Sequence, residues 1–546
     1  MAVSAGARRW IGLIAVALGV ALIVVDTTIV NVITPSVIDD LGINSSQAQW
    51  IQESYAIVFA ALLLVSGRIA DLRGARSVFI GGVVIFGATS LLAGLASNGE
   101  ILILARFLQG IGAAAILPTS LALLNHMFTG PARGQAFAVW GSTIGAATAL
   151  GPVLGGWLSE HASWRWAFGI NIPLVIIILV IAVIFLPQPP RSRGSVDGLS
   201  AVLSILGLGL LAFGLVEGRV YGWVMSEQPF TLFGATWDAG LSPAFVALVL
   251  SVVLMTVFVC RQVVISRVNS KHQPLMDVKL FSISSFRNGN IATLIIGLGE
   301  FGIIAVLPLW LQFTLDYTPL EAGATLVPIA IGSFVASGIS FPLSAKVSPL
   351  ALVRIGLILE VVGLAGLGLV AAVTDANWWF IALVLFFYGI GVGFATSQVT
   401  NVVLADVPEG DGGQSSGIQS TFRQLGSALG IAALTTVFFS SLGSTLQNKL
   451  TDAGLSGAEA SNLSNAVTDS AGAAIGPLAA NPETVFVADA AREAMTQAIA
   501  FGSYLAAGFL IIGVVATLLI PSKRLTEKAH ADSVSTEAQN SVSGKA

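Results

Sequence analysis

The stretch IGLIAVALGVALIVVDTTIVNVITP, from Ile11 to Pro35, decides the fold of this chain. It is a hydrophobic run long enough to cross a bilayer, which takes roughly 20 residues, and it carries one carboxylate, Asp26. An ionised acid at membrane depth costs at least about 2.5–3.5 kcal/mol, so such a residue is a functional-site hypothesis by default. We expect Asp26 to bind a proton or a cation inside a water-accessible cavity that the rest of the protein builds and gates.

The composition indicates a polytopic helical membrane protein. Apolar residues make up 55% of the 546 residues and charged residues 10%, whereas a soluble domain has about 25% charged residues, and the mean hydropathy is +0.87. The formal charge of −4 gives no reason to expect nucleic-acid binding, because the charged residues lie in short loops. A single cysteine, Cys260, excludes an intramolecular disulfide and a thiolate cluster for a metal.

Fourteen apolar segments of about 20 residues or slightly more follow one another along the chain, and each is a predicted membrane span. The spans are expected near residues 11–33, 48–67, 77–96, 101–124, 134–158, 166–186, 198–217, 242–262, 288–314, 320–343, 350–372, 378–403, 413–441 and 498–520. An even number of spans places both termini on one side, and 19 of the 25 lysines and arginines fall on that side. The positive-inside rule therefore predicts cytoplasmic termini in a multi-pass protein of the inner membrane.

Three polar segments interrupt this pattern. Residues 187–197 form a proline-rich cytoplasmic linker, and the chain from Thr526 onward is polar and expected to be disordered. Residues 441–497 form a long extracytoplasmic segment with two basic and six acidic side chains. Leucines recur four residues apart at 442, 446 and 450, so we expect part of this segment to be an amphipathic helix that lies on the outer face. Its partner is not indicated by the sequence.

The turn between the second and third spans reads GRIADLRGAR, from Gly67 to Arg76. Two interpretations stay open for it at this point. An acid and arginines between two glycines can form a charge lock between helices that breaks and re-forms during motion. Alternatively, the arginines follow the positive-inside rule and have no gating role. The residues concerned are Gly67, Arg68, Asp71, Gly74 and Arg76.

Two further patterns lie within spans. The fourth span contains RFLQGIG, from Arg106 to Gly112, and an arginine at membrane depth needs a carboxylate or backbone oxygens close by, which favours a functional role. The fifth span carries a stripe of small residues that allows close helix approach, and its proline kinks the helix, although plain packing explains these residues equally well. The stripe consists of Gly141, Gly145, Gly151, Pro152, Gly155 and Gly156.

Together these patterns resemble the major facilitator superfamily and, within it, the fourteen-span drug:proton antiporters. DTTIVNV with Pro35 resembles the first-span signature of that family, GRIADLRGAR its loop motif, RFLQGIG its fourth-span motif and GSTIGAATALGPVLGG its fifth-span antiporter motif. SWRWAFGINIP, LPLWLQFTLDYTPLEAG and GIGVGFATSQ followed by STFRQLGSALG are similar to its later patterns. The resemblance covers about residues 11 to 440 and the last span.

The resemblance implies an all-α membrane protein with two six-helix bundles that rock about a central site. The expected units are an N-terminal bundle (1–190), a linker with a two-helix insert (191–280), a C-terminal bundle (281–524) and a tail (525–546). Span 9 becomes the counterpart of span 1 and has its own acid, Glu300. Burial in a low-dielectric cavity favours the protonated carboxyl, so each acid can hold a proton and release it when a cation competes.

The roles that follow are predictions. Asp26 and Glu300 couple protons and substrate, and Arg106 tunes Asp26; the Gly67–Arg76 turn gates the inner face, and the glycine stripe forms the seam between the bundles. Glu360, in a span that the family places at the bundle periphery, is a weaker candidate for transport. Further candidates for the substrate cavity are Asn31, Glu53, Tyr55, Gln109 and Gln312.

The predicted function is proton-coupled export of lipophilic, often cationic small molecules, with small-molecule substrates, protons and the lipid bilayer as the partners of a monomer. One alternative is a dedicated exporter of an endogenous metabolite, lipid or antibiotic on the same scaffold. Another is a membrane scaffold or sensor that transports nothing. Neither an enzyme nor a cofactor or metal site is expected, because no nucleophile–base pair, metal-ligand cluster or phosphate-binding loop occurs in the sequence.

Overall fold

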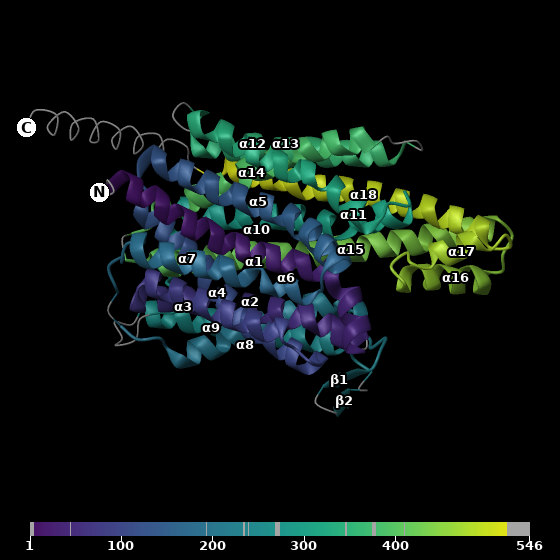
Figure 1. The fold of residues 1–546 in the computed structure, drawn as a ribbon, viewed down its shortest axis with the longest axis horizontal. Helices are drawn as coiled ribbons and strands as arrows, with labels where there is room; N and C mark the ends of the chain where they lie inside the picture. Colours follow the sequence, from purple (N-terminus) through teal and green to yellow (C-terminus); the bar gives the residue numbers. More distant parts are fainter. Residues whose placement is uncertain are drawn as a thin grey trace, which may run out of the picture.

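A computed structural model of the chain describes residues 5–43, 45–192, 194–232, 235–237, 240–267, 274–343, 347–373, 378–408 and 410–520. Long helices that run nearly parallel make up almost all of this part (Figure 1). Fourteen helical segments within it are long and apolar enough to cross a membrane, which confirms the predicted number of spans. We call the end of the bundle where α1 begins the terminal face, and the end where α1 finishes the distal face. The predicted tail, 525–546, lies outside the described residues.

The first six spans form the N-terminal bundle. Its helices are α1 (Ala5–Leu41), α2 (Ser45–Arg73), α3 (Ala75–Gly94), α4 (Gly99–Met127), α5 (Gly130–His161), α6 (Arg165–Gly169) and α7 (Asn171–Phe185). The sixth span is divided into α6 and α7 because Pro173 has no N–H to donate to the carbonyl of Gly169. Gly74 alone separates α2 from α3, and its φ of +93° is a left-handed backbone conformation that glycine adopts without strain.

The insert consists of α8 (Gly198–Tyr221) and α9 (Pro243–Arg267). Between them lies an antiparallel hairpin of β1 (Phe230–Leu232) and β2 (Ala235–Trp237), with Phe230 opposite Trp237. This hairpin was not predicted from the sequence. The loop is long enough to pair with itself beside the distal face (Figure 1). Asp197 caps α8, because its carboxylate accepts from the Ser200 N–H at 3.2 Å.

The last six spans form the C-terminal bundle. Its elements are the short helix η1 (Val278–Ser282), α10 (Ser284–Phe313), α11 (Pro319–Thr325), α12 (Val327–Leu343), α13 (Pro349–Ala371), α14 (Trp378–Leu404), α15 (Gly412–Asp452), α16 (Gly457–Asp469), α17 (Ile475–Ala480) and α18 (Val485–Leu518). The tenth predicted span is α11 followed by α12. Pro328 interrupts it in the same way, because it has no N–H for the carbonyl of Ala324.

Residues 441–497 form a helical extension of the bundle. Helix α15 continues to Asp452 and α18 already begins at Val485, so both helices project beyond the other spans with α16 and α17 beside them (Figure 1). Leu442, Leu446 and Leu450 are fully buried in the core that these helices share. The expected surface-lying amphipathic helix is therefore wrong. Leucines four apart do lie on one helical face, but that face packs against neighbouring helices and not against a membrane surface.

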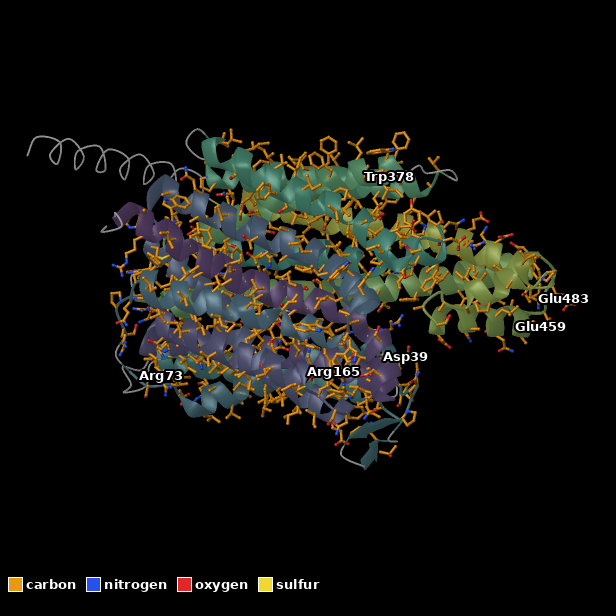
Figure 2. The ribbon with its side chains drawn as sticks, in the orientation of Figure 1. Asp39, Arg73, Arg165, Trp378, Glu459 and Glu483 are labelled. Carbon is orange, nitrogen blue, oxygen red and sulfur yellow. The ribbon has the colours of Figure 1, made fainter. Side chains whose placement is uncertain are left out.

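The two bundles meet where α2 packs on α15 and where α5 packs on α12 and α14, and α8 of the insert lies against α2 and α15. Polar side chains gather at the two ends of the molecule, with Arg73 at the terminal face and Asp39 and Arg165 at the distal face (Figure 2). Between these ends the outer surface is mostly carbon, as a bilayer requires.

Candidate functional site

A buried polar cluster surrounds Asp26 in the middle of the N-terminal bundle. The Asp26 carboxylate forms an ion pair with Arg106 of α4. Its Oδ1 also accepts hydrogen bonds from Gln109 Nε2 at 2.8 Å and from Asn171 Nδ2, on α7, at 2.9 Å. Ser90 of α3 accepts from the same two amides at 2.9 and 3.2 Å. Side chains of α4 and α7 thus hold the carboxylate of α1 in a fixed position, and Ser90 of α3 orients the two amides.

The Arg106 side chain is also held in place by several contacts. Its Nε donates to the carbonyl of Ile51 at 3.1 Å and its Nη1 to Gln109 Oε1 at 2.7 Å. The guanidinium carbon lies 4.3 Å from the centroid of the Tyr55 ring, at a distance typical of a cation–π contact. Asp26 is 0% and Arg106 1% exposed. The water-accessible setting expected for Asp26 is therefore wrong for this conformation, because a guanidinium and two amides occupy the positions that water would take.

A second polar cluster lies in the C-terminal bundle around Glu300 of α10. Glu300 Oε1 accepts from Thr396 Oγ1, on α14, at 2.8 Å, and Oε2 lies 3.7 Å from Nη2 of Arg423, on α15. Tyr388 donates to the backbone carbonyl of Glu300 at 3.0 Å. Each bundle thus pairs one buried acid with one arginine, and the second pair is the looser of the two.

Asp71 joins the two bundles at the terminal face. Its carboxylate accepts from the backbone N–H of Gly413 at 2.6 Å and of Gln414 at 2.7 Å, in the first turn of α15. The N-terminus of a helix carries a partial positive charge, so it binds a carboxylate well. Beside it, a Cβ on Gly67 would lie 2.9 Å from Gly417 Cα, so the absent side chain allows α2 and α15 to approach closely.

Further contacts close the same face. Arg133 Nε donates to Asn401 Oδ1 at 2.9 Å, between α5 and α14. The linker adds Ser192, whose N–H donates to the Asp71 carbonyl at 2.8 Å and whose hydroxyl donates to the Gly410 carbonyl at 2.8 Å. These bonds connect the N-terminal bundle and the linker to α14 and α15, so the terminal face is closed in this conformation.

The two arginines of the predicted gate differ in their surroundings. Arg76 donates to the carbonyl of Val183 on α7, within its own bundle. Arg68 is buried. A Cβ built on Gly74 would lie 3.4 Å from Nε of Arg191 in the linker. The expectation that Arg76 takes part in a charge lock is therefore wrong, because its guanidinium donates to a backbone carbonyl of α7. Asp71 instead binds a helix N-terminus.

The glycine stripe of α5 divides between two interfaces. A Cβ on Gly141 would lie 2.8 Å from Ser397 Cβ, and one on Gly145 would lie 2.6 Å from Ser333 Oγ, so these two glycines face the C-terminal bundle. The next two, Gly151 and Gly155, pack instead against α1, on Thr28 and Ile29. The predicted seam between the bundles is thus wrong for Gly151 and Gly155. Six residues are 600° of helix, so Gly145 and Gly151 point to different neighbours.

The remaining candidates are dispersed. A Cβ on Gly156 would be 4.0 Å from Leu320, which is ordinary contact with the other bundle. Glu53 lies on α2 beside Glu217 of the insert helix α8, and Gln312 is half-buried near the distal end of α10. The structure does not bring these two side chains into the Asp26 cluster. The side chains of Asn31 and Pro152 lie outside the described part of the chain.

Several residues of the two clusters were not predicted as site residues. Asn171 has a sequence signal, because it is an amide at the start of the apolar run NIPLVIIILVIAVIF. Arg423 is a charge within a predicted span and was open to the same argument as Arg106. Ser90 and Thr396 lack such a signal, since serine and threonine occur in many spans and can hydrogen-bond to the backbone of their own helix. Tyr388 lacks one because its residue type alone does not show which helix its hydroxyl reaches.

The comparison with known proteins identifies the family. The model of the Major Facilitator Superfamily matches residues 16–431. This chain belongs to the Major Facilitator Superfamily. It is 32% identical over 460 residues to the probable actinorhodin transporter of Streptomyces coelicolor, covering 80% of this chain and 74% of that protein. It is 34% identical over 436 residues to a puromycin resistance protein of Streptomyces alboniger, covering 79% and 82%.

Two further comparisons agree with this assignment. A multidrug efflux pump of Mycolicibacterium smegmatis is 29% identical over 435 residues, covering 79% of this chain and 81% of that pump. Among solved structures, the human organic anion transporter MFSD10 superposes with a TM-score of 0.59 at 14% identity, covering 93% of this chain and 99% of that one. The fold and the drug-efflux family predicted from the sequence are therefore confirmed, and the protein is a multi-pass membrane transporter.

Proposed function

We propose that this transporter is a proton-coupled antiporter that exports lipophilic, often cationic small molecules across a bacterial cytoplasmic membrane. The observation that carries the proposal is the burial of Asp26 against Arg106, Gln109 and Asn171 in the middle of a transport bundle. A buried ion pair is weak evidence for stability, because desolvation offsets most of its attraction. Proton exchange on Asp26 during transport explains why the protein retains an ion pair whose desolvation costs free energy.

The proposed cycle is alternating access between the two bundles. We assign the terminal face to the cytoplasm, because the basic residues concentrate there. Asp71 and its contacts with Gly413 and Gln414 then close the cytoplasmic side. Opening that side breaks these bonds and admits substrate, while Asp26 and Glu300 take up or release protons according to which side is open.

The test is transport by the purified full-length protein in proteoliposomes with an imposed pH gradient. Ethidium, a lipophilic cation, is measured beside zwitterionic and neutral dyes. We expect proton-driven ethidium transport by the wild type and its loss in Asp26→Asn. Glu483→Gln is the matched control, because Glu483 is an exposed acid on the distal extension (Figure 2). Wild-type transport by Asp26→Asn would show that this acid does not couple protons.

A second candidate function is the export of a single antibiotic or metabolite. The names of two similar proteins favour it, since one is a probable actinorhodin transporter and the other a puromycin resistance protein. Competition between ethidium and the dye panel in the same vesicles separates the two functions. A multidrug pump shows mutual competition among several chemically unrelated dyes, whereas a dedicated exporter responds to one chemical class.

A further inference from the structure

Glu360 is a buried acid whose carboxyl group forms no hydrogen bond within the described part of the chain. It lies on α13, is 0% exposed, and neither Oε1 nor Oε2 has a hydrogen-bond partner among the described residues. Gly391 of α14 faces it so closely that a Cβ there would lie 2.6 Å from Glu360 Cγ. Helix α13 has an exposed side, but Glu360 is on its other side, where the side chain points into the bundle and α14 covers it.

The free-energy cost of burying a charge determines the protonation state of the Glu360 carboxyl. Removing an ionised carboxylate from water costs several kcal/mol even after relaxation, and hydrogen bonds or an adjacent cation must offset that cost. Glu360 has no such bonds among the described residues. Glu300 does have them, since Thr396 donates at 2.8 Å and Arg423 lies at 3.7 Å. Glu300 is thus the acid of this cluster whose ionised form has partners, and Glu360 is the acid whose ionised form has none among the described residues.

Three titratable groups act on Glu360 from the neighbouring helices. They are Glu300 of α10, Arg423 of α15 and Tyr388 of α14, whose hydroxyl already donates to the Glu300 carbonyl. Helix α18 also packs on α13, and its Tyr504 lies two turns away from Glu360, beside Gly368. The cluster therefore combines the guanidinium of Arg423 with the carboxyl groups of Glu300 and Glu360. It is neutral only while one of the two carboxyl groups carries a proton.

We propose that Glu360 is a proton-binding site of the transport cycle, which holds one exchangeable proton next to the Glu300–Arg423 pair. This inference rests on the proposed antiport function. Loss of the proton from the Glu360 carboxyl leaves two carboxylates and one guanidinium, a net charge of −1 in an apolar interior. That charge is tolerated only when a cation or water enters the cluster. A cationic substrate and the Glu360 proton therefore exclude each other, which is the exchange that an antiporter performs.

The protonation state is tested directly by infrared spectroscopy of the purified protein at neutral pH. Glu360→Gln replaces the neutral acid with an isosteric neutral amide, so the melting temperature should stay close to that of the wild type. A band from the protonated carboxyl should be present in the wild type and in Glu483→Gln, and weaker in Glu360→Gln. If the band is unchanged in Glu360→Gln, the proposal is overturned. Glu360→Leu, which is apolar and of similar size, provides a second variant if the amide disturbs folding.

The role in coupling is tested with ethidium in proteoliposomes. Glu360→Gln should reduce transport driven by a pH gradient by about tenfold or more, while downhill ethidium equilibration without a gradient stays near the wild-type rate. Gradient-driven transport at the wild-type level would refute the role of Glu360 and leave the antiport function intact. A wild-type protein that ignores the pH gradient would instead refute the antiport function, and with it the role of Glu360 in coupling.

Discussion

Asp71 of α2 caps the first turn of α15 by accepting the Gly413 N–H at 2.6 Å, across the boundary between the two bundles. The same carboxylate accepts the Gln414 N–H at 2.7 Å, so both oxygens are used. A charged acceptor at a helix N-terminus benefits both from its hydrogen bonds and from the helix dipole. This contact therefore links the two bundles at the terminal face, and in the proposed cycle it breaks when that face opens.

Removal of the charge at Asp71 should loosen the closed terminal face. Asp71→Asn loses one acceptor oxygen and the ionic part of both bonds, and hydrogen bonds to charged groups contribute about 1.5–3 kcal/mol. We expect amide hydrogen exchange in residues 410–417 to become roughly 10- to 100-fold faster. Asp411→Asn is the matched control, because Asp411 precedes α15 but makes no side-chain cap. Equal acceleration in both variants would argue against the cap.

A methyl group at Gly67 should have a similar effect for a steric reason. A Cβ there would clash with the Gly413 carbonyl and lie 2.9 Å from Gly417 Cα, both of which are backbone atoms. Gly67→Ala should therefore separate α2 from α15 and speed exchange in residues 410–417. Gly81→Ala is the control, since no atom lies within 4 Å of a Cβ at that helical position, and alanine stabilises a helix by roughly 0.8–1 kcal/mol relative to glycine. A Gly67→Ala protein as well protected as Gly81→Ala would contradict the close packing.

Part of this architecture could be predicted from the sequence because membrane burial leaves a strong signal. Apolar runs of bilayer length located the spans, and the charges within them identified Asp26, Arg106 and Glu300. Their partners were harder to predict. Asp26 is bound by Asn171, which is distant in the sequence. Ser90, which accepts from the same amide, is of a residue type that is common in spans. Which helices meet is a property of the packed bundle, and single-residue patterns do not encode it.

The direction of a helix is also absent from its periodicity. Leucines four apart at 442, 446 and 450 predicted a helix correctly but not that it continues α15 straight out of the bundle. For the same reason the stripe of α5 indicated close helix approach without indicating that Gly151 contacts α1 and Gly145 contacts α12. Glu360 shows the limit most clearly, since only the packed structure places it beside Glu300.

The Asp26–Arg106 pair should behave as one unit in stability but not in transport. Removing either partner leaves the other as an uncompensated buried charge, which costs about 3–5 kcal/mol. We expect Asp26→Asn and Arg106→Gln each to lower the unfolding free energy strongly, and the double variant to recover much of the loss. Transport should stay absent in the double variant because no acid remains at that position. Denaturant unfolding in detergent and vesicle transport measure the two effects.

The exposed pair of Asp40 and Arg165 is the control for this double-mutant cycle. Its side chains are 47% and 37% exposed and lie 2.5 Å apart, at the distal face. Solvent screens such pairs, so their mutual dependence should be far smaller than that of the buried pair. If the effects of Asp26→Asn and Arg106→Gln simply add, the two residues do not act as a unit.

Asp197 and Arg261 link α8 and α9, the two helices of the insert, which is separate from the two six-helix bundles. Asp197 Oδ2 accepts from Arg261 Nε at 2.8 Å and Oδ1 from Nη2 at 3.0 Å. These hydrogen bonds from Arg261 lower the pKa of Asp197 from 3.8 to about 2. Because the pKa in the folded state lies below the pKa in the unfolded chain, the stabilisation is present above pH 4 and is lost as the pH falls toward 2.

Asp197→Asn should therefore destabilise the protein at neutral pH but not in strong acid. Arg261 is 34% exposed, so solvent screening limits the expected loss at pH 7 to about 1–2 kcal/mol. The melting temperature in detergent should be lower than that of the wild type at pH 7, and the gap should narrow between pH 4 and pH 2. Glu483→Gln, an exposed acid, should show no such gap at any pH. A difference that persists unchanged at pH 2 would mean that lost packing or the lost cap of α8, and not the charge of Asp197, causes it.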